Sequence, residues 1–165
     1  MKNPKSKVKV QVSMGEGAVA RAPQVVSSTG LGSCVAVALY DPQRRIGGLA
    51  HIMLPDSVSL NGHHGPYRCV NTAIATLLKK LRARGVTNRD IVAKIVGGAR
   101  MFASYDGSET GIGDQNIVSV KHLLTREGIR LIGEDTGGHR GRSVEFHLDS
   151  GKLTVMVIGE EDKEI

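Results

Sequence analysis

Alternating apolar and polar positions, together with short apolar runs, predict that most of the chain forms β-strands. Pro23 interrupts the second expected strand and suits a bend or an edge position. A turn signal at residues 41–44 joins the third and fourth strands into a hairpin. The expected strands cover residues 8–13, 18–26, 34–40, 46–54, 91–96, 129–133, 143–148 and 152–158.

Two segments in the middle of the chain instead repeat apolar residues every three or four positions, which predicts amphipathic helices. The first helix is expected over residues 70–81 and the second over residues 114–127, and glycines at 85 and 128 end them. Strands first, helices in the middle and strands again indicate an α+β domain. We expect one such domain over residues 10–159.

Composition favours a cytoplasmic globular protein. The chain has 165 residues, of which 40% are hydrophobic, and no apolar run approaches the roughly 20 residues that cross a bilayer. Residues 1–9 are basic without a following apolar stretch, so we expect a disordered tail and no secretory signal or membrane insertion. Residues 160–165 form an acidic tail. The two cysteines are expected to remain reduced thiols.

The net charge of +6 favours an acidic partner. The basic residues do not form a stripe studded with aromatic side chains, and no nucleic-acid-binding motif is present, so nucleic acid is not expected as a partner.

A cysteine and a histidine form the sharpest candidate site. Cys34 follows the glycine loop at residues 29–33 and begins an apolar strand, while His51 is the only polar side chain within the apolar stretch 49–54. In a hairpin centred near residues 41–43, Cys34 and His51 would lie opposite each other with Cβ atoms ~5 Å apart. His51 could then deprotonate Cys34 to form a thiolate–imidazolium pair. A buried inert thiol and a hydrogen-bonded core histidine are the competing interpretations.

A third side chain is needed to orient the imidazole, and Ser28 and Thr29 carry suitable hydroxyls just before the glycine loop. Turn formation is the alternative role for both residues. Together with Cys34 and His51, three more residues could suggest a metal site: His63, His64 and Cys69. Their spacing fits no zinc pattern, so we expect neither a metal nor a cofactor.

Several blocks of sequence resemble the chemoreceptor glutamine deamidase family CheD. They are 28–37, STGLGSCVAV; 50–55, AHIMLP; 97–102, GGARMF; 112–113 with Asn116; 135–138, DTGG; and 141–144, GRSV. The resemblance spans residues 12 to about 157 and implies a layered α/β/β arrangement of mixed sheets, with two main helices packed on one side.

The resemblance implies an amidohydrolase that converts glutamines of methyl-accepting chemoreceptors to glutamates with release of ammonia. It places the nucleophile on Cys34 and the base on His51. The family's third residue, a threonine six positions before the cysteine, falls on Ser28, with Thr29 as the alternative. Backbone N–H groups around Ser33 and Cys34 are candidates for the oxyanion hole, and Gly32 and Ser33 for contact with the substrate.

Other functions stay open at this point. Some members of the family also hydrolyse methyl esters. The chain could instead be a binding module that docks on chemoreceptors or regulates a CheC-type phosphatase. A third interpretation is a cysteine hydrolase of small amides.

Overall fold

The computed structural model describes residues 7–58, 60–61, 64–102 and 110–165. Within these residues the chain forms two α-helices, α1 (Val70–Arg82) and α2 (Ile112–Arg126), and a short 3₁₀ turn at Asn88–Asp90. The strands are β1 (Lys9–Gln11), β2 (Gly17–Arg21), β3 (Val25–Leu31), β4 (Val35–Asp41), β5 (Ile46–Ile52), β6 (Val92–Gly97), β7 (Arg130–Thr136), β8 (Arg142–His147), β9 (Leu153–Met156) and β10 (Lys163–Glu164).

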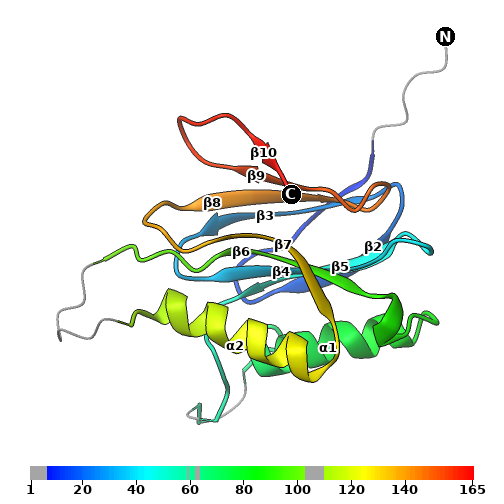
Figure 1. Cartoon of the computed structure of the whole chain (residues 1–165), viewed down its shortest axis with the longest axis horizontal. Helices are drawn as coiled ribbons and strands as arrows, with labels where there is room; N and C mark the ends of the chain where they lie inside the picture. Colours follow the sequence, from blue (N-terminus) through cyan, green and yellow to red (C-terminus); the bar gives the residue numbers. More distant parts are fainter. Residues whose placement is uncertain (1–6, 59, 62–63, 103–109) are drawn as a thin grey trace.

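The strands make two mixed five-stranded sheets. Sheet A has the order β1-β3-β8-β9-β10 and sheet B the order β2-β5-β4-β6-β7. Both helices cover one face of sheet B, and sheet A covers the other, which gives three layers (Figure 1). This arrangement confirms the expected α+β fold with α/β/β layers and two helices on one side.

Strand β4 lies at the centre of this arrangement and is buried along its whole length. One set of its side chains, including Val35 and Val37, packs with the helices. The alternate set, including Ala36 and Ala38, packs in a second core between the two sheets. A strand covered on both faces needs a continuous apolar run, which is why its sequence shows no alternation.

The strand expected over residues 18–26 is two strands. Residues 17–21 form β2 in sheet B, and the chain crosses at Pro23 to enter sheet A as β3. Proline cannot donate a ladder hydrogen bond, so it ends one strand and allows the chain to change sheets. This crossing carries residues 25–31, and Ser28 with them, to the layer that faces sheet B.

The β4–β5 hairpin has a different register from the expected one. Asp41 pairs with Ile46 across a loop of residues 42–45, and Ala36 pairs with His51. The Asp41 carboxylate accepts hydrogen bonds from the Gln43 and Arg44 N–H groups at 2.9 and 3.1 Å. Asp41 is therefore the last strand residue, and the ladder is shifted by two positions from that of a turn centred at 41–43.

The described structure includes part of each expected tail. Residues 1–6 lie outside the described part of the chain, but Lys9 starts β1, which pairs with β3. Lys7 and Lys9 make ion pairs with Asp149 and Glu145. At the other end, β10 pairs with β9 within residues 160–165. No helix in the described residues is long and apolar enough to cross a membrane.

Candidate active site

Cys34 lies at the end of a short loop, one residue before β4. Two backbone hydrogen bonds hold this loop to the segment after β6, from Gly98 N–H to Cys34 O at 2.8 Å and from Ala99 N–H to Gly32 O at 2.9 Å. Gly97 approaches Cys34 O closely with a φ of 111°, a backbone conformation that favours glycine. The thiol-bearing residue is 9% exposed, so it is largely buried but not sealed off from solvent.

His51 lies in β5 with its side chain in the core between the two sheets, where it is 1% exposed. Its Nδ1 is 2.8 Å from Ser28 Oγ, which comes from β3 in the other sheet. Ser28 Oγ donates its hydrogen to Val12 O at 2.6 Å. Since the hydroxyl has one hydrogen, it must accept a hydrogen bond from Nδ1–H. The neutral imidazole therefore carries its proton on Nδ1 and a lone pair on Nε2.

The lone pair on His51 Nε2 is buried and has no hydrogen-bond partner among the described residues. A buried polar atom without a partner is uncommon and often marks a functional site. In general base catalysis, this is the atom that accepts a proton from the nucleophile. Ser28 thus fixes the tautomer and orientation in which the imidazole could act as a base.

The structure brings Cys34 and His51 to the same face of sheet B but not directly opposite each other. His51 pairs with Ala36, and continuing the ladder by one pair would set Cys34 opposite Met53. The expected direct pairing was wrong because the register is shifted by two residues. An even shift keeps both side chains on one face, and diagonal positions of a regular ladder lie ~7–8 Å apart between Cα atoms. No hydrogen bond joins the thiol to Nε2.

Burial acts on the pKa of both groups. It raises the pKa of the Cys34 thiol, an effect that the residue's own backbone N–H partly opposes. Burial lowers the pKa of His51. Both directions favour a neutral thiol and a neutral imidazole at neutral pH. The expected thiolate–imidazolium pair is therefore not the form that burial favours.

The backbone around Cys34 offers donors for an oxyanion. The Gly32 N–H is directed at Gly30 O at 3.2 Å, whereas the Ser33 and Cys34 N–H groups donate to no other described residue. A pocket of about 210 Å³ reaches Ser33 from outside. Its lining residues are Ser33, Ala99, Arg100, Met101, Phe102, Gly111, Ile112 and Gly113. An extended side chain could thus approach the loop that carries the thiol.

Of the remaining candidates from the sequence, those that the structure describes are not brought into this site. Thr29 is exposed and Ser28 is fully buried, so only the serine meets the imidazole. Cys69 is buried at the start of α1. His63 lies outside the described residues, within which no cluster of three potential metal ligands occurs.

Sequence reasoning missed two groups that support the site. One is Val12 O, a backbone atom without any sequence signature. The other is Asn116 of α2, which is fully buried beside the Cys34 loop. Asn116 belongs to a block that resembles the CheD family, but the sequence assigned it no role.

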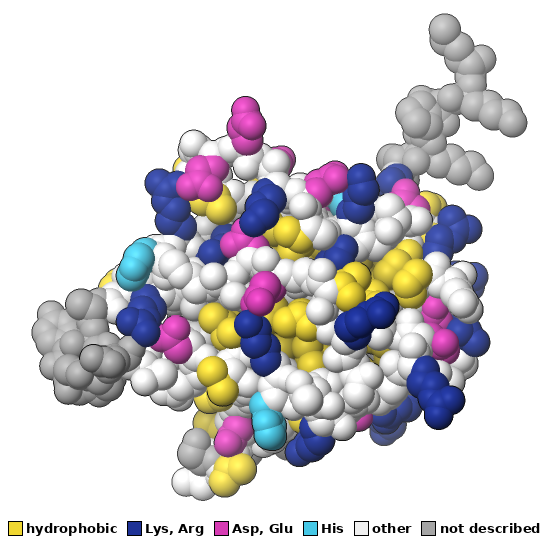
Figure 2. Space-filling model, viewed as in Figure 1, with side chains coloured by type: hydrophobic (Ala, Val, Ile, Leu, Met, Phe, Trp, Pro, Cys, Tyr) yellow, Lys and Arg dark blue, Asp and Glu magenta, His cyan; other side chains and the backbone are white. Residues whose placement is uncertain are grey.

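Charge on the surface is mixed. Lys and Arg side chains alternate with Asp and Glu on the face in Figure 2 and do not form a basic stripe there. The chain as a whole carries a net charge of +6, which gives the molecule a weak general preference for acidic partners.

Comparison with known proteins identifies the family. A family model described as CheD chemotactic sensory transduction matches residues 53–157. A probable chemoreceptor glutamine deamidase CheD of Desulforamulus reducens is 40% identical over 162 residues, 98% of both chains. The chemoreceptor glutamine deamidase CheD of Thermotoga maritima is 43% identical over 152 residues, 92% of this chain and 94% of the relative.

A solved structure, the hypothetical protein YfiH of Bacillus licheniformis, is 18% identical with a TM-score of 0.48 and covers 72% of this chain and 49% of its own. The family model and the two relatives decide the assignment, and they confirm the resemblance seen in the sequence blocks. The chain belongs to the CheD family.

Proposed function

We propose that this protein is a chemoreceptor glutamine deamidase, a cysteine hydrolase that converts glutamine side chains of methyl-accepting chemoreceptors to glutamates and releases ammonia. The names of its relatives support the substrate. The chemistry is carried by one observation: His51 donates Nδ1–H to Ser28 and keeps a buried, unpartnered lone pair on Nε2, on the face where Cys34 lies.

In the proposed acylation step, the thiol of Cys34 attacks the carbon of the glutamine carboxamide. Its proton passes to His51 Nε2 as the carbon–sulfur bond forms, so a neutral resting pair suffices. The carbonyl oxygen becomes an oxyanion that accepts hydrogen bonds from the Ser33 and Cys34 N–H groups. His51 then gives its proton to the departing nitrogen, and the carbon–nitrogen bond breaks to leave a thioester and ammonia.

In the deacylation step, His51 removes a proton from a water molecule that attacks the thioester carbon. A second oxyanion forms at the same backbone donors and collapses by breaking the carbon–sulfur bond. The thiolate of Cys34 takes back a proton from His51, and the product is a glutamate side chain. These steps use water and groups of this chain alone.

The proposal also includes a cytoplasmic location and a CheC-type phosphatase as a second partner. Cys34 and Cys69 are free thiols, which suits the reducing cytoplasm, where the receptor's adaptation region would be modified. A CheC-type phosphatase that covered the same face would compete with the receptor. Adding such a protein should then slow deamidation without changing the final extent of the reaction.

Mass spectrometry of a receptor cytoplasmic fragment tests the proposed reaction. Incubation with this protein should add about one mass unit at a glutamine, because an amino group is replaced by a hydroxyl. Cys34→Ala should abolish the gain, and Cys69→Ala should retain it as the matched cysteine control. Receptor binding without any mass gain would contradict the proposal and favour a binding module.

The hydroxyl that orients His51 is tested in the same assay. Ser28→Ala leaves Nδ1–H without its acceptor and should lower the deamidation rate roughly 5- to 30-fold, equivalent to losing a hydrogen bond of about 1–2 kcal/mol. Thr29→Ala changes an exposed side chain and should have little effect. A reversed order of the two variants would exclude Ser28 as the orienting residue.

A further inference from the structure

Asn116 is a fully buried polar side chain that the proposed steps do not use. Its Nδ2 donates two hydrogen bonds, to Ser33 O at 3.0 Å and to Met53 O at 3.1 Å. Both partners are carbonyl oxygens, so only the amide NH₂ can face them. The Asn116 side chain therefore bridges the two chain segments just beyond Val35–Ile52, the last pair of the β4–β5 ladder.

The hydrogen bond from Asn116 to Ser33 O fixes the plane of the Ser33–Cys34 peptide, whose N–H is a candidate oxyanion donor. In a trans peptide, the carbonyl of one residue and the N–H of the next point in opposite directions. Holding Ser33 O toward Asn116 thus turns the Cys34 N–H away from α2. This N–H donates to no other described residue, and it acts on its own thiol by lowering the pKa of Cys34. It faces the side on which the reacting sulfur lies.

The second acceptor of Asn116, Met53 O, connects the Ser33–Cys34 peptide to the strand that carries the proposed base His51. Met53 lies two residues after His51 and follows β5 directly. Asn116 therefore sets the Ser33–Cys34 peptide and the strand that carries His51 at a fixed separation. A shift of either segment would move the oxyanion donor relative to the imidazole.

The amide oxygen of Asn116, Oδ1, is buried and has no described hydrogen-bond donor. An unsatisfied buried acceptor costs stability, so a side chain placed here for packing alone would be better apolar. The asparagine is thus best explained by what its Nδ2 holds in place.

We propose that Asn116 is a positioning residue for the oxyanion hole: it holds the Ser33–Cys34 peptide with the Cys34 N–H directed toward the reacting carbonyl oxygen. The inference rests on the proposed cysteine hydrolysis and adds a residue to it. Without the bridge, this peptide can rotate so that the Ser33 carbonyl replaces the N–H donor. The thiol and its base would remain in place, but the tetrahedral intermediate would lose a donor.

Two reactions of Cys34 separate this role from a general structural one. Acylation by a p-nitrophenyl ester passes through an oxyanion, whereas alkylation by iodoacetamide does not. In Asn116→Leu, the acylation rate should fall roughly 10²- to 10³-fold, the usual loss for one oxyanion donor. Alkylation should stay within about threefold of the wild-type rate, and receptor deamidation should lose kcat with little change in KM.

A second residue of α2, Ser119, provides the control for Asn116→Leu. Ser119→Ala removes another side-chain hydrogen bond from α2, to Pro55 O at 2.8 Å, and should change neither reaction. If Asn116→Leu does not fold, Asn116→Ser keeps one donor but not the bridging amide and should show a smaller loss in acylation alone. Equal losses in acylation and alkylation, or no loss, would overturn the positioning role. Absence of receptor deamidation by the wild-type protein would instead refute the proposed function.

Discussion

At the scale of single residues, burial explains how the proposed nucleophile and base coexist without forming an ion pair. Desolvation raises the pKa of Cys34 and lowers that of His51, and each shift favours the uncharged form. A neutral imidazole with a free Nε2 lone pair is ready to accept a proton. The thiol needs to lose its proton only when a carboxamide is present.

This balance predicts the pH dependence of Cys34 alkylation. Because the thiolate is the nucleophile and the pKa of the thiol lies above its ordinary value of 9.0, the rate of reaction with iodoacetamide should rise roughly tenfold per pH unit between about pH 6 and 8. Cys34→Ser measures the background from Cys69, which is fully buried. A rate that is already constant below about pH 7 would instead reveal a stable thiolate–imidazolium pair.

The sequence could identify the residues whose chemistry is unusual for their position. Cys34 after a glycine loop and His51 in an apolar strand are both visible in the sequence. The structure places both on the same face of sheet B and joins His51 to Ser28 by a hydrogen bond. Val12 O and Asn116 Nδ2 could not be found in this way. Their roles depend on contacts between residues that are 16 positions apart for Val12 and Ser28 and 83 positions apart for Asn116 and Ser33. The residue types at these positions do not predict such contacts.

At the scale of elements, periodicity predicted both helices and most strands, but it could not predict how they pair. The continuous apolar run of β4 indicated a buried strand, which the structure confirms. The register depended instead on the Asp41 carboxylate, whose hydrogen bonds end the strand at that residue. The assignment of β2 and β3 to different sheets depends on partners distant in sequence.

The start of α2 gives a prediction in which packing opposes helix propensity. Alanine stabilises a helix interior by about 1 kcal/mol relative to glycine. In Gly113→Ala, however, the new Cβ would lie 2.5 Å from Gly98 O and 2.7 Å from Ala99 O, which are backbone atoms of the segment that holds the Cys34 loop. We therefore expect a net loss of about 1–2 kcal/mol, a fall in Tm of roughly 2–8 °C and slower deamidation.

Gly111→Ala is the matched control for this variant. Among the described residues, a Cβ at Gly111 would meet no atom closer than Asp114 Oδ2 at 3.7 Å. Its Tm should therefore stay within about 2 °C of the wild-type value. A rise in Tm for Gly113→Ala in thermal unfolding would show that α2 can move away from the loop without cost.

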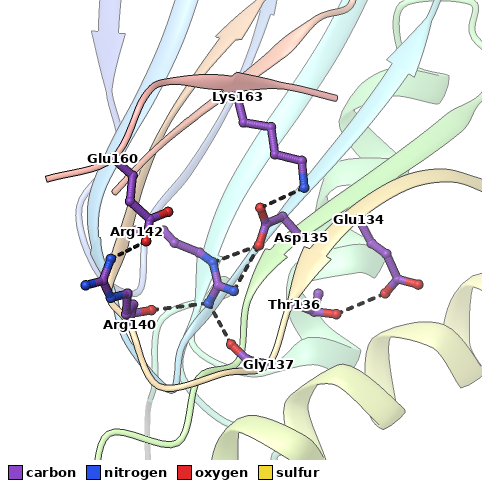
Figure 3. A network of polar contacts seen from close by, with 8 residues as sticks. All are labelled: Glu134, Asp135, Thr136, Gly137, Arg140, Arg142, Glu160 and Lys163. Atoms are coloured by element: carbon purple, nitrogen blue, oxygen red, sulfur yellow. Dashed lines mark hydrogen bonds and ion pairs between the residues drawn. The ribbon is translucent and has the colours of Figure 1, made fainter. Parts of the chain in front are cut away.

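At the scale of the whole molecule, the proposed site depends on the two sheets keeping their relative position. Ser28 belongs to sheet A and His51 to sheet B, so their hydrogen bond crosses between the layers. A second connection crosses at the edge where β7 of sheet B leads into β8 of sheet A (Figure 3). There the Arg142 guanidinium from β8 binds the Asp135 carboxylate of β7 at 2.9–3.0 Å.

Arg142 has further partners that make this connection stronger than a surface ion pair. It also donates to Gly137 O at 2.8 Å and to Arg140 O at 3.2 Å, and its side chain is only 10% exposed. Lys163 of β10 adds a longer contact of 3.3 Å to Asp135 (Figure 3). The same turn reaches the segment behind the Cys34 loop, because Arg100 N–H donates to Gly138 O at 2.8 Å.

Replacing Arg142 should therefore destabilise the whole domain. Arg142→Met keeps much of the side-chain volume but leaves the Asp135 carboxylate and two backbone carbonyls without their main donor, which should cost about 2–3 kcal/mol and lower Tm by roughly 4–12 °C. Arg140→Ala breaks an exposed pair with Glu160 and should change Tm by less than about 2 °C. Equal Tm values for the two variants in calorimetry would mean that the contacts of Arg142 add no stability to the domain. A selective loss in Arg142→Met would show that this polar connection also fixes the layers between which Ser28 and His51 meet.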